Sequence, residues 1–361
     1  MKHRRSAFAL VVLGAVVASV GVYAQKDKKQ EEAEKKEIQS IVKIVDGMAA
    51  GQPAPNDLSA TWLREDHLKA QGNKQYVPFT VSLDPSKISG GTVAFYWRVV
   101  AKTAAPADVP AAGQQKDEKK DKDKKRPDYA YEDVSFVPVT AGQNPMRIVR
   151  SFTVSAGSYD VYIVVKEPAQ EKAPKNAPPP KVSLFKQVVN VPDFWNGEFS
   201  TSSVIVAQRI DPLPAPLTPV QQVDRPYALG VLEFVPAYDT KMSKKSELST
   251  FMLIYNPKVD SANKPDMLVE YNFCQASDGN QPKAGEPCKA GEKFFNKTTP
   301  QNLNASTLPP QFDLAAGHQL QTGQAVPLAL FPEGEYRLEI KVTDKIANKV
   351  LVRDVNFSVA P

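Results

Sequence analysis

The two cysteines, Cys274 and Cys288, are the residues whose type and spacing most directly suggest chemistry. An even pair in an exported chain is most simply a disulfide, and the polar, turn-rich segment between them suits a stapled loop. Closing a loop of about 15 residues stabilises a fold by about 3 kcal/mol in the chain-entropy model. A redox-active or metal-binding pair would need CxxC-type spacing or additional histidine ligands. The spacing therefore predicts a structural Cys274–Cys288 disulfide.

Outside the N-terminal leader, the sequence has two histidines that could act in catalysis or bind a metal, His67 and His318, and they lie in different halves of the chain. His67 follows Glu65 and Asp66, an arrangement that would suit a metal or acid–base cluster but is more typical of an exposed polar turn. The sequence has no GxSxG, GxGxxG, HExxH, phosphate-loop or EF-hand pattern. We therefore predict no catalytic, cofactor-binding or metal-binding residues and no enzymatic activity. An unrecognised hydrolase is the alternative, because sequence alone cannot measure the separation between two carboxylates.

Aromatic side chains could stack on a sugar or a peptide. Trp62 and Trp195 fall in irregular segments and are the candidates for ligand stacking. Trp97 lies among β-branched and aromatic residues in TVAFYWRVVA, so we expect it in a core. Trp195 follows Phe194 at a predicted interdomain join, where packing is the competing role.

The elements that would carry these residues are strands, and the final hairpin over 328–359 is the clearest example. Apolar and polar residues alternate strictly from Tyr336, as in a strand with one buried face. Gly334 precedes Tyr336, which resembles the structural tyrosine corner of immunoglobulin-like sandwiches. The apolar phase of the return strand changes at Arg353 and Asp354, and this change predicts a β-bulge there.

A second copy of this hairpin lies over 157–191. Tyr159 follows Gly157 as Tyr336 follows Gly334, and the return strand changes phase near Phe185 and Lys186, where a second bulge is expected. Two further matches lie upstream in the same order: FTVSLDP (79–85) with FMLIYNP (251–257), and Tyr96 with Tyr271. Colinear matches of this kind predict an internal duplication.

The duplication sets the expected domains, which are two tandem all-β immunoglobulin-like sandwiches over 57–192 and 193–361. Before the first sandwich, the segment 25–56 is predicted to hold a charged amphipathic helix and a linker. The helix is expected over 29–48, where apolar residues recur at helical spacing, and its apolar face is expected to dock on the first sandwich. A partner-binding role for this helix is the alternative. The loop 103–128 combines mixed charge with few apolar residues and is expected to be disordered.

The N-terminus carries an export signal. Basic residues precede an uninterrupted run of small and apolar residues over 7–22, and Val22-Tyr23-Ala24 fits a cleavage rule, so cleavage is expected after Ala24. An uncleaved anchor is the alternative, and it would be the protein's one attachment to a membrane. The formal net charge is +5, and removing Lys2, Arg4 and Arg5 with the signal peptide leaves +2. This near-neutral charge and export both argue against a nucleic-acid partner.

The segments LPPQFDLAAGHQL (308–320) and FPEGEYRLEIKVTDKIANKVLVRDVNFSV (331–359) resemble the β-rich C-terminal region of exported acidobacterial proteins, some of which carry a von Willebrand factor A-related domain. The resemblance covers about residues 199–361 and implies an immunoglobulin- or fibronectin III-like sandwich and export. The D-x-S-x-S metal motif of the A-type domain is missing from this sequence, so the resemblance implies no metal-dependent adhesion.

These observations predict a non-catalytic structural or protein-interaction protein of the bacterial cell envelope. It would be periplasmic, at the cell surface or extracellular, bind a protein or envelope partner, and need no cofactor. A carbohydrate-binding module that uses Trp62 or Trp195 to bind a glycan is the alternative.

Overall fold

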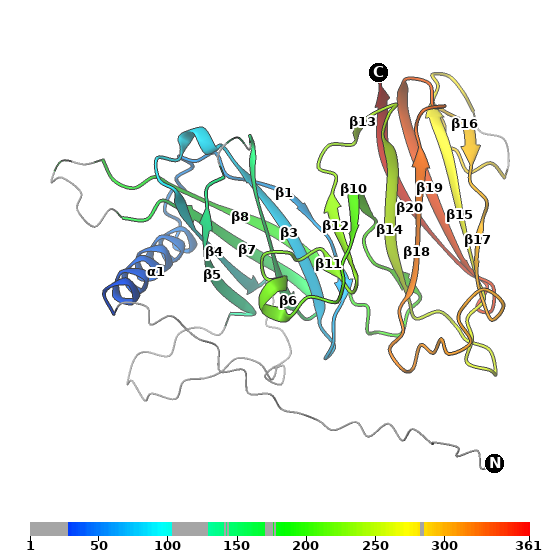
Figure 1. The fold of residues 1–361 in the computed structure, drawn as a ribbon, viewed down its shortest axis with the longest axis horizontal. Helices are drawn as coiled ribbons and strands as arrows, with labels where there is room; N and C mark the ends of the chain where they lie inside the picture. Colours follow the sequence, from blue (N-terminus) through cyan, green and yellow to red (C-terminus); the bar gives the residue numbers. More distant parts are fainter. Residues whose placement is uncertain are drawn as a thin grey trace, which may run out of the picture.

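The structure is a computed structural model that describes residues 28–102, 129–140, 142, 144–169, 176, 178–281 and 285–361. The signal peptide with its cleavage site at Ala24 and the charged loop 103–128 lie outside the described residues, so both stay predictions. The described chain is mostly β, with one long helix at its N-terminal end and strands arranged in four sheets (Figure 1).

Strands from residues 61–191 form two sheets that face each other, which we call the first sandwich. One sheet has the order β1-β3-β2, with β6 also paired to β3, and the other has the order β5-β4-β7-β8. Aromatic side chains fill the space between them, including Phe79, Phe152 and the fully buried Trp97, whose indole donates to the Ser151 carbonyl at 3.2 Å. The predicted core position of Trp97 is confirmed. The strands are β1 (Thr61–Glu65), β2 (Leu68–Lys69), β3 (Gln75–Leu83), β4 (Thr92–Ala101), β5 (Tyr131–Pro138), β6 (Met146–Val154), β7 (Gly157–Lys166) and β8 (Val182–Val191), with a 3-10 turn, η1 (Pro85–Lys87).

Helix α1 (Lys28–Ala49) covers the outer face of the β5-β4-β7-β8 sheet (Figure 1). Ile41 and Val45 on its apolar stripe are completely buried against this sheet. Two ion pairs hold the ends of the contact, Glu37 with Lys166 and Asp46 with Arg98, the second at 2.7 Å. The sequence-based helix and its docking on the first sandwich are therefore confirmed.

Strands from residues 200–360 form the other two sheets, which we call the second sandwich. One sheet has the order β11-β12-β10-β14-β18, with β9 paired to β14; the other has the order β13-β20-β19-β15-β16, with β17 paired to β15. The strands are β9 (Ser200–Thr201), β10 (Ile205–Pro212), β11 (Ala228–Leu229), β12 (Leu232–Pro236), β13 (Lys241–Ser243), β14 (Glu247–Tyr255), β15 (Met267–Ala276), β16 (Glu292–Lys297), β17 (Gln301–Leu303), β18 (Leu320–Pro327), β19 (Gly334–Asp344) and β20 (Lys349–Ala360), with a short helix, α2 (Pro219–Gln222). The path β16-β15-β19-β20 repeats the order of β5-β4-β7-β8 in the first sandwich.

The bulges expected in the two return strands are absent, and these two predictions were wrong. β20 pairs with β19, and β8 with β7, in unbroken register from end to end. In β8 the apolar phase changes because Leu184 faces helix α1 on the outside, whereas Val189 faces the inner core. In β20 the corresponding outward residues, Val350 and Val352, are left exposed. A change of apolar phase therefore marks apolar residues on both faces of a strand, whether or not the outward face is covered, and requires no bulge.

The proposed match of Tyr96 with Tyr271 is displaced by one residue. Tyr96 faces outward under α1, whereas Tyr271 faces the inner core. The strand registers explain the difference, because Trp97 pairs with Ile163 and Tyr271 pairs with Ile340, each four residues after the tyrosine that begins its hairpin. Trp97 is therefore the structural counterpart of Tyr271.

Candidate functional site

The two sandwiches are joined by apolar contacts between the sheet that holds β3 and the sheet that holds β14. One cluster buries Leu68 with Phe194, Leu253 and Tyr255. A second cluster buries residues of β10 and β12 and reaches Val149 on β6. We call this contact region the junction.

Buried polar groups fix the geometry of the junction. Arg64 pairs with Asp66 at 2.6 Å and also donates to the carbonyl oxygens of Val204 and Ala237 in the second sandwich. Asp66 in turn accepts a hydrogen bond from the Tyr227 hydroxyl at 2.6 Å. Burial raises the pKa of Tyr227 well above its usual value, with Asp66 adding to the effect, so this hydroxyl stays a donor at neutral pH. A buried network of this kind is costly to break and holds the two sandwiches in one relative orientation.

His67 lies in the junction and not in an exposed turn, so that prediction was wrong. Its backbone N–H donates to the Ser203 hydroxyl at 2.9 Å, and its carbonyl accepts from the Ser203 N–H. Burial lowers the pKa of His67, although Glu65 and Asp66 act in the opposite direction. Its ring atom Nε2 is buried without a hydrogen-bond partner in the described structure. The chain after β1 turns into the junction, which no local sequence pattern indicates.

An open cleft of about 850 Å³ lies beside the junction, and we call it the junction cleft. This volume is within the range of about 300–1,000 Å³ that is typical of ligand clefts, which often form between domains. Its residues come from β6 of the first sandwich and from β10, β14, β18 and the 237–246 segment of the second. They are Arg147, Gln208, Arg209, Ile210, Ala237, Tyr238, Asp239, Lys241, Met242, Ser243, Ser246, Glu247, Ser249 and Ala325.

The cleft exists because β10 separates from β14 partway along its length. The two strands pair only from Ile205 to Ala207, while β10 continues to Pro212 on its partner β12. The register between β10 and β12 shifts between Ala207 and Arg209, which places a bulge at Gln208. Bulges bend the strand that carries them, so β10 turns away from β14 at this residue and opens the cleft.

The rim of the cleft is charged. The Arg147 guanidinium lies over the Tyr238 ring at 4.6 Å from its centroid. Tyr238 is held by a hydrogen bond to Thr80 at 3.1 Å, and burial raises the pKa of its hydroxyl. Arg209 pairs with Asp211 at 2.8 Å on the surface. Such a rim can recognise a polar or charged partner, since stacking holds the planar donor groups of an arginine in place.

The two tryptophans proposed for ligand stacking do not lie together. Trp62 is stacked on the core ring of Phe79 at 4.7 Å and donates its indole N–H to Glu65. Trp195 is 41% exposed and donates to the carbonyl oxygens of Ala70 and Lys74, both at 3.1 Å. Trp62 pairs with Val81 near one end of β3, and Lys74 precedes the other end, so the two rings are separated by roughly 20 Å along the strand. They cannot form one joint stacking platform.

Both predicted corner tyrosines form the same contact. The Tyr159 hydroxyl donates to the Ser155 carbonyl and the Tyr336 hydroxyl to the Pro332 carbonyl, each at 2.8 Å and four residues upstream. A tyrosine corner has this geometry. Both hydroxyls therefore take part in building the ends of their sandwiches.

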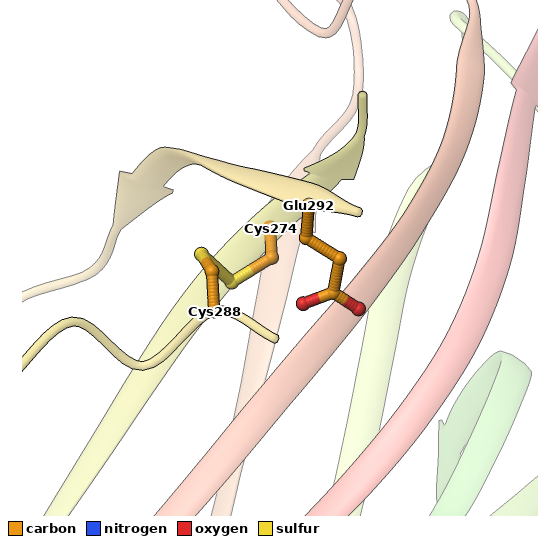
Figure 2. Close-up of side chains that lie close together, drawn as sticks. All are labelled: Cys274, Cys288 and Glu292. Atoms are coloured by element: carbon orange, nitrogen blue, oxygen red, sulfur yellow. A yellow bond between two sulfur atoms is a disulfide. The ribbon is translucent and has the colours of Figure 1, made fainter. Parts of the chain in front are cut away.

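Cys274 and Cys288 form the predicted disulfide, with their Cα atoms 5.6 Å apart. Glu292 lies beside them (Figure 2). In the described part of the chain, these three residues form a cluster whose side chains are of types that can bind a metal ion. The sulfurs are bonded to each other, and Glu292 is engaged by Arg337 at 2.6 Å. That hydrogen bond lowers the pKa of Glu292, so its carboxylate is charged and paired. The group is therefore a structural staple over the outer face of the second sandwich.

Arg337 explains how the disulfide loop is held. It lies almost fully buried and reaches Asp354 at 2.8 Å and the Pro287 carbonyl at 3.0 Å as well as Glu292. The hydrogen bonds to Glu292 and Asp354 outweigh its burial and raise its pKa. The cysteine pair predicted the disulfide, but no pattern indicated this arginine, because an alternating strand pattern assigns a charged residue to a solvent-exposed face.

Comparisons with known proteins assign no family. No protein-family model matches the sequence, and no curated protein matches it. Among solved structures, Salmonella alpha-2-macroglobulin reacted with methylamine is 13% identical, with 86% of this chain and 17% of that chain covered and a TM-score of 0.19. The native conformation of E. coli alpha-2-macroglobulin is 11% identical, with 86% and 16% covered and a TM-score of 0.19.

The chain thus spans about a sixth of the length of these proteins. A likeness this distant assigns neither a family nor a function to this chain. Among the described residues, neither α1 nor α2 combines the length and the hydrophobicity of a membrane-spanning helix. The resemblance to exported acidobacterial proteins stays a prediction.

Proposed function

We propose that this chain is an exported, non-catalytic binding protein of the cell envelope, built from two duplicated immunoglobulin-like sandwiches, and that a partner protein binds in the junction cleft. The observation that supports this function most directly is the cleft itself, an open and charged hollow between two sandwiches that buried hydrogen bonds hold in place. A preformed surface of this kind loses little conformational freedom on binding. The disulfide fits an oxidising compartment outside the cytoplasm.

The repeated strand order and the two corner tyrosines support the duplication. Sandwiches commonly present loops and strand edges to partners, and function then lies in the surface that one copy has acquired. Here the cleft lies next to β10, which pairs first with β14 and then continues along β12, whereas the corresponding strand of the first sandwich, β1, is paired with β3 alone in the described residues. The partner site is therefore proposed for the junction and not for either sandwich alone.

In vivo photo-crosslinking tests the proposed function. A photo-reactive amino acid replaces Arg209 in the cleft, and a matched control replaces Lys43, which is exposed on helix α1. We expect a crosslinked protein adduct of defined mass at position 209 but not at position 43. The absence of any adduct, or equal adducts at both positions, would count against a partner in the cleft.

Trp195 supports a second candidate function, which is glycan binding. Its ring is substantially exposed, and the Lys69 ammonium lies 4.0 Å from the ring centroid. A glycan array with the mature chain tests this candidate, with Trp195→Ala as the variant and Trp62→Ala as the comparison. Glycan binding that survives Trp195→Ala would exclude this residue, and the absence of glycan binding would exclude the function.

A further inference from the structure

We infer that the junction cleft binds an extended, acidic polypeptide segment as an added β-strand along the free edge of β10. This inference rests on the proposed protein-binding function and specifies the kind of partner. Three features of the cleft support it: the direction of the backbone groups, the exposure of the strand, and the charges on the rim.

The backbone of β10 presents hydrogen-bonding groups to the cleft. The Leu213 N–H donates to the Val231 carbonyl, and Phe234 of β12 donates away from β10, to Tyr227. Backbone groups alternate in direction along a strand. The N–H and C=O groups of Arg209 and Asp211 therefore point toward β12, and those of Ile210 point toward the cleft. The pairing of β10 with β14 ends at Ala207, so β14 does not use the Ile210 N–H and C=O groups.

β14 presents a matching group on the other side of the cleft. The Leu328 N–H donates to the Ser246 carbonyl, so Ser246 and Leu248 point toward the chain at β18. The alternation then directs the backbone of Glu247 toward β10, and both Glu247 and Ile210 line the cleft. Glu247 of β14 thus borders the same open space, and the added strand pairs with the edge on the opposite side, at Ile210 of β10.

The free edge is short and accessible. Gln208, Arg209 and Ile210 are all exposed, so side chains on both faces of this part of β10 are open to solvent. The strand ends at Pro212, whose missing N–H limits pairing beyond it. Short edges that end in proline resist uncontrolled strand addition, so this edge suits a short and specific segment.

The charges favour an acidic segment. Arg147, Arg209 and Lys241 contribute three cations to the cleft, against the carboxylates of Asp239 and Glu247, and a further carboxylate, Asp211, pairs with Arg209 at 2.8 Å. The Asp239 carboxylate already accepts the Lys241 backbone N–H at 2.8 Å. Arg147 is held over the Tyr238 ring, with its donor groups available for a carboxylate in bidentate geometry. Acidic side chains at alternate positions of an added strand would meet these cations on one face.

The experiment selects random twelve-residue peptides displayed on phage against the whole mature chain, and then measures the enriched peptide by fluorescence polarisation. We expect enrichment of peptides with alternating acidic residues and no proline at their centre. Ile210→Pro removes the free N–H and should weaken binding about tenfold or more, whereas Ile210→Ala keeps that N–H and should change binding less than about threefold. Arg147→Glu should weaken binding about fivefold or more through charge reversal.

A modified peptide keeps the test valid if Ile210→Pro does not fold. N-methylation at alternate residues of the enriched peptide should abolish binding in one phase and preserve it in the other, because only one phase points its N–H groups at β10. Equal binding in both phases, equal binding by Ile210→Pro, or no enriched peptide would overturn strand addition. If one of these results is found but crosslinking at position 209 still captures a partner, strand addition is wrong and the proposed protein-binding function stands. If crosslinking also captures no partner, the proposed function is wrong as well.

Discussion

The outer faces of the two sandwiches share a strand order but differ in what covers them. In the first sandwich, Tyr96, Val164 and Leu184 form a paired apolar row across β4, β7 and β8. Helix α1 packs on this row, and its residues Ile41 and Val45 are completely buried there. The outer face of this sheet is thus a second core.

The same row in the second sandwich is Glu270, Lys341 and Val352, which are paired across β15, β19 and β20. Val164 and Lys341 each lie five residues after their corner tyrosine, so the positions correspond. Lys341 pairs with Glu270 at 3.4 Å, and Val352 is 43% exposed. Two charged residues in place of two apolar ones leave this face open except where the disulfide loop covers one end. The outward residues of two sheets with the same strand order therefore decide whether another segment packs on them.

Val45→Asp should produce the largest effect and would test whether α1 is part of the first core. A carboxylate at this fully buried position has no partner, so we expect a loss of more than about 3 kcal/mol from the first sandwich. Urea unfolding of the mature chain measures the loss, and Lys43→Asp, at an exposed position of the same helix, is the control. Equal stability of the two variants would mean that the helix does not stabilise the sheet.

Removal of the disulfide should have the next largest effect, in the second sandwich. The Cys274→Ala, Cys288→Ala double variant opens a loop whose ends are 14 residues apart, with an expected loss of about 3 kcal/mol. Unfolding of the variant with and without reductant provides the control, because reductant should weaken the natural chain alone. A variant that unfolds at the same urea concentration as the natural chain would show that the Arg337 contacts hold the loop without the disulfide.

A matched pair of substitutions compares the two faces directly. Leu184→Ala removes a buried side chain beneath α1 and should cost about 2 kcal/mol. Val352→Ala, at the corresponding exposed position, should cost less than about 0.5 kcal/mol. Thermal and urea unfolding measure both changes. Similar costs at the two positions would indicate that another segment or partner covers the outer face of the second sandwich in solution.

The smallest expected effect is a pH dependence of the junction. Burial holds the pKa of His67 below its usual value near 6.5, so the unfolded chain binds a proton more readily than the folded chain. The stability that the folded chain has with a neutral His67 is fully present above pH 6.5. It decreases as the pH falls from the pKa of His67 in the unfolded chain to its lower pKa in the folded chain. Unfolding at pH 7.5 and 5.5 should therefore show a decrease that is smaller in His67→Gln. An unchanged decrease in the variant would assign the effect to other groups.

Several features could be predicted from the sequence because they depend on neighbours along the chain. The alternation after Tyr159 and Tyr336 identified both hairpins, and the helical spacing before residue 49 identified α1. The isolated cysteine pair identified the disulfide. The candidate site was not predicted, because Arg147 and Ile210 are distant in the sequence and meet only where β10 leaves β14.

By itself, the sequence determined which side chains share a face of each strand, because that periodicity is a property of the local backbone. The tertiary structure alone decided what lies against each face. It placed α1 over Leu184 and left Val352 open, so the same change of phase in two strands arose without the bulges that the pattern suggested. It also brought His67 into the junction and opened the cleft at Gln208. The physical reason is that a face is buried by whichever segment packs on it, and that segment can come from any part of the chain.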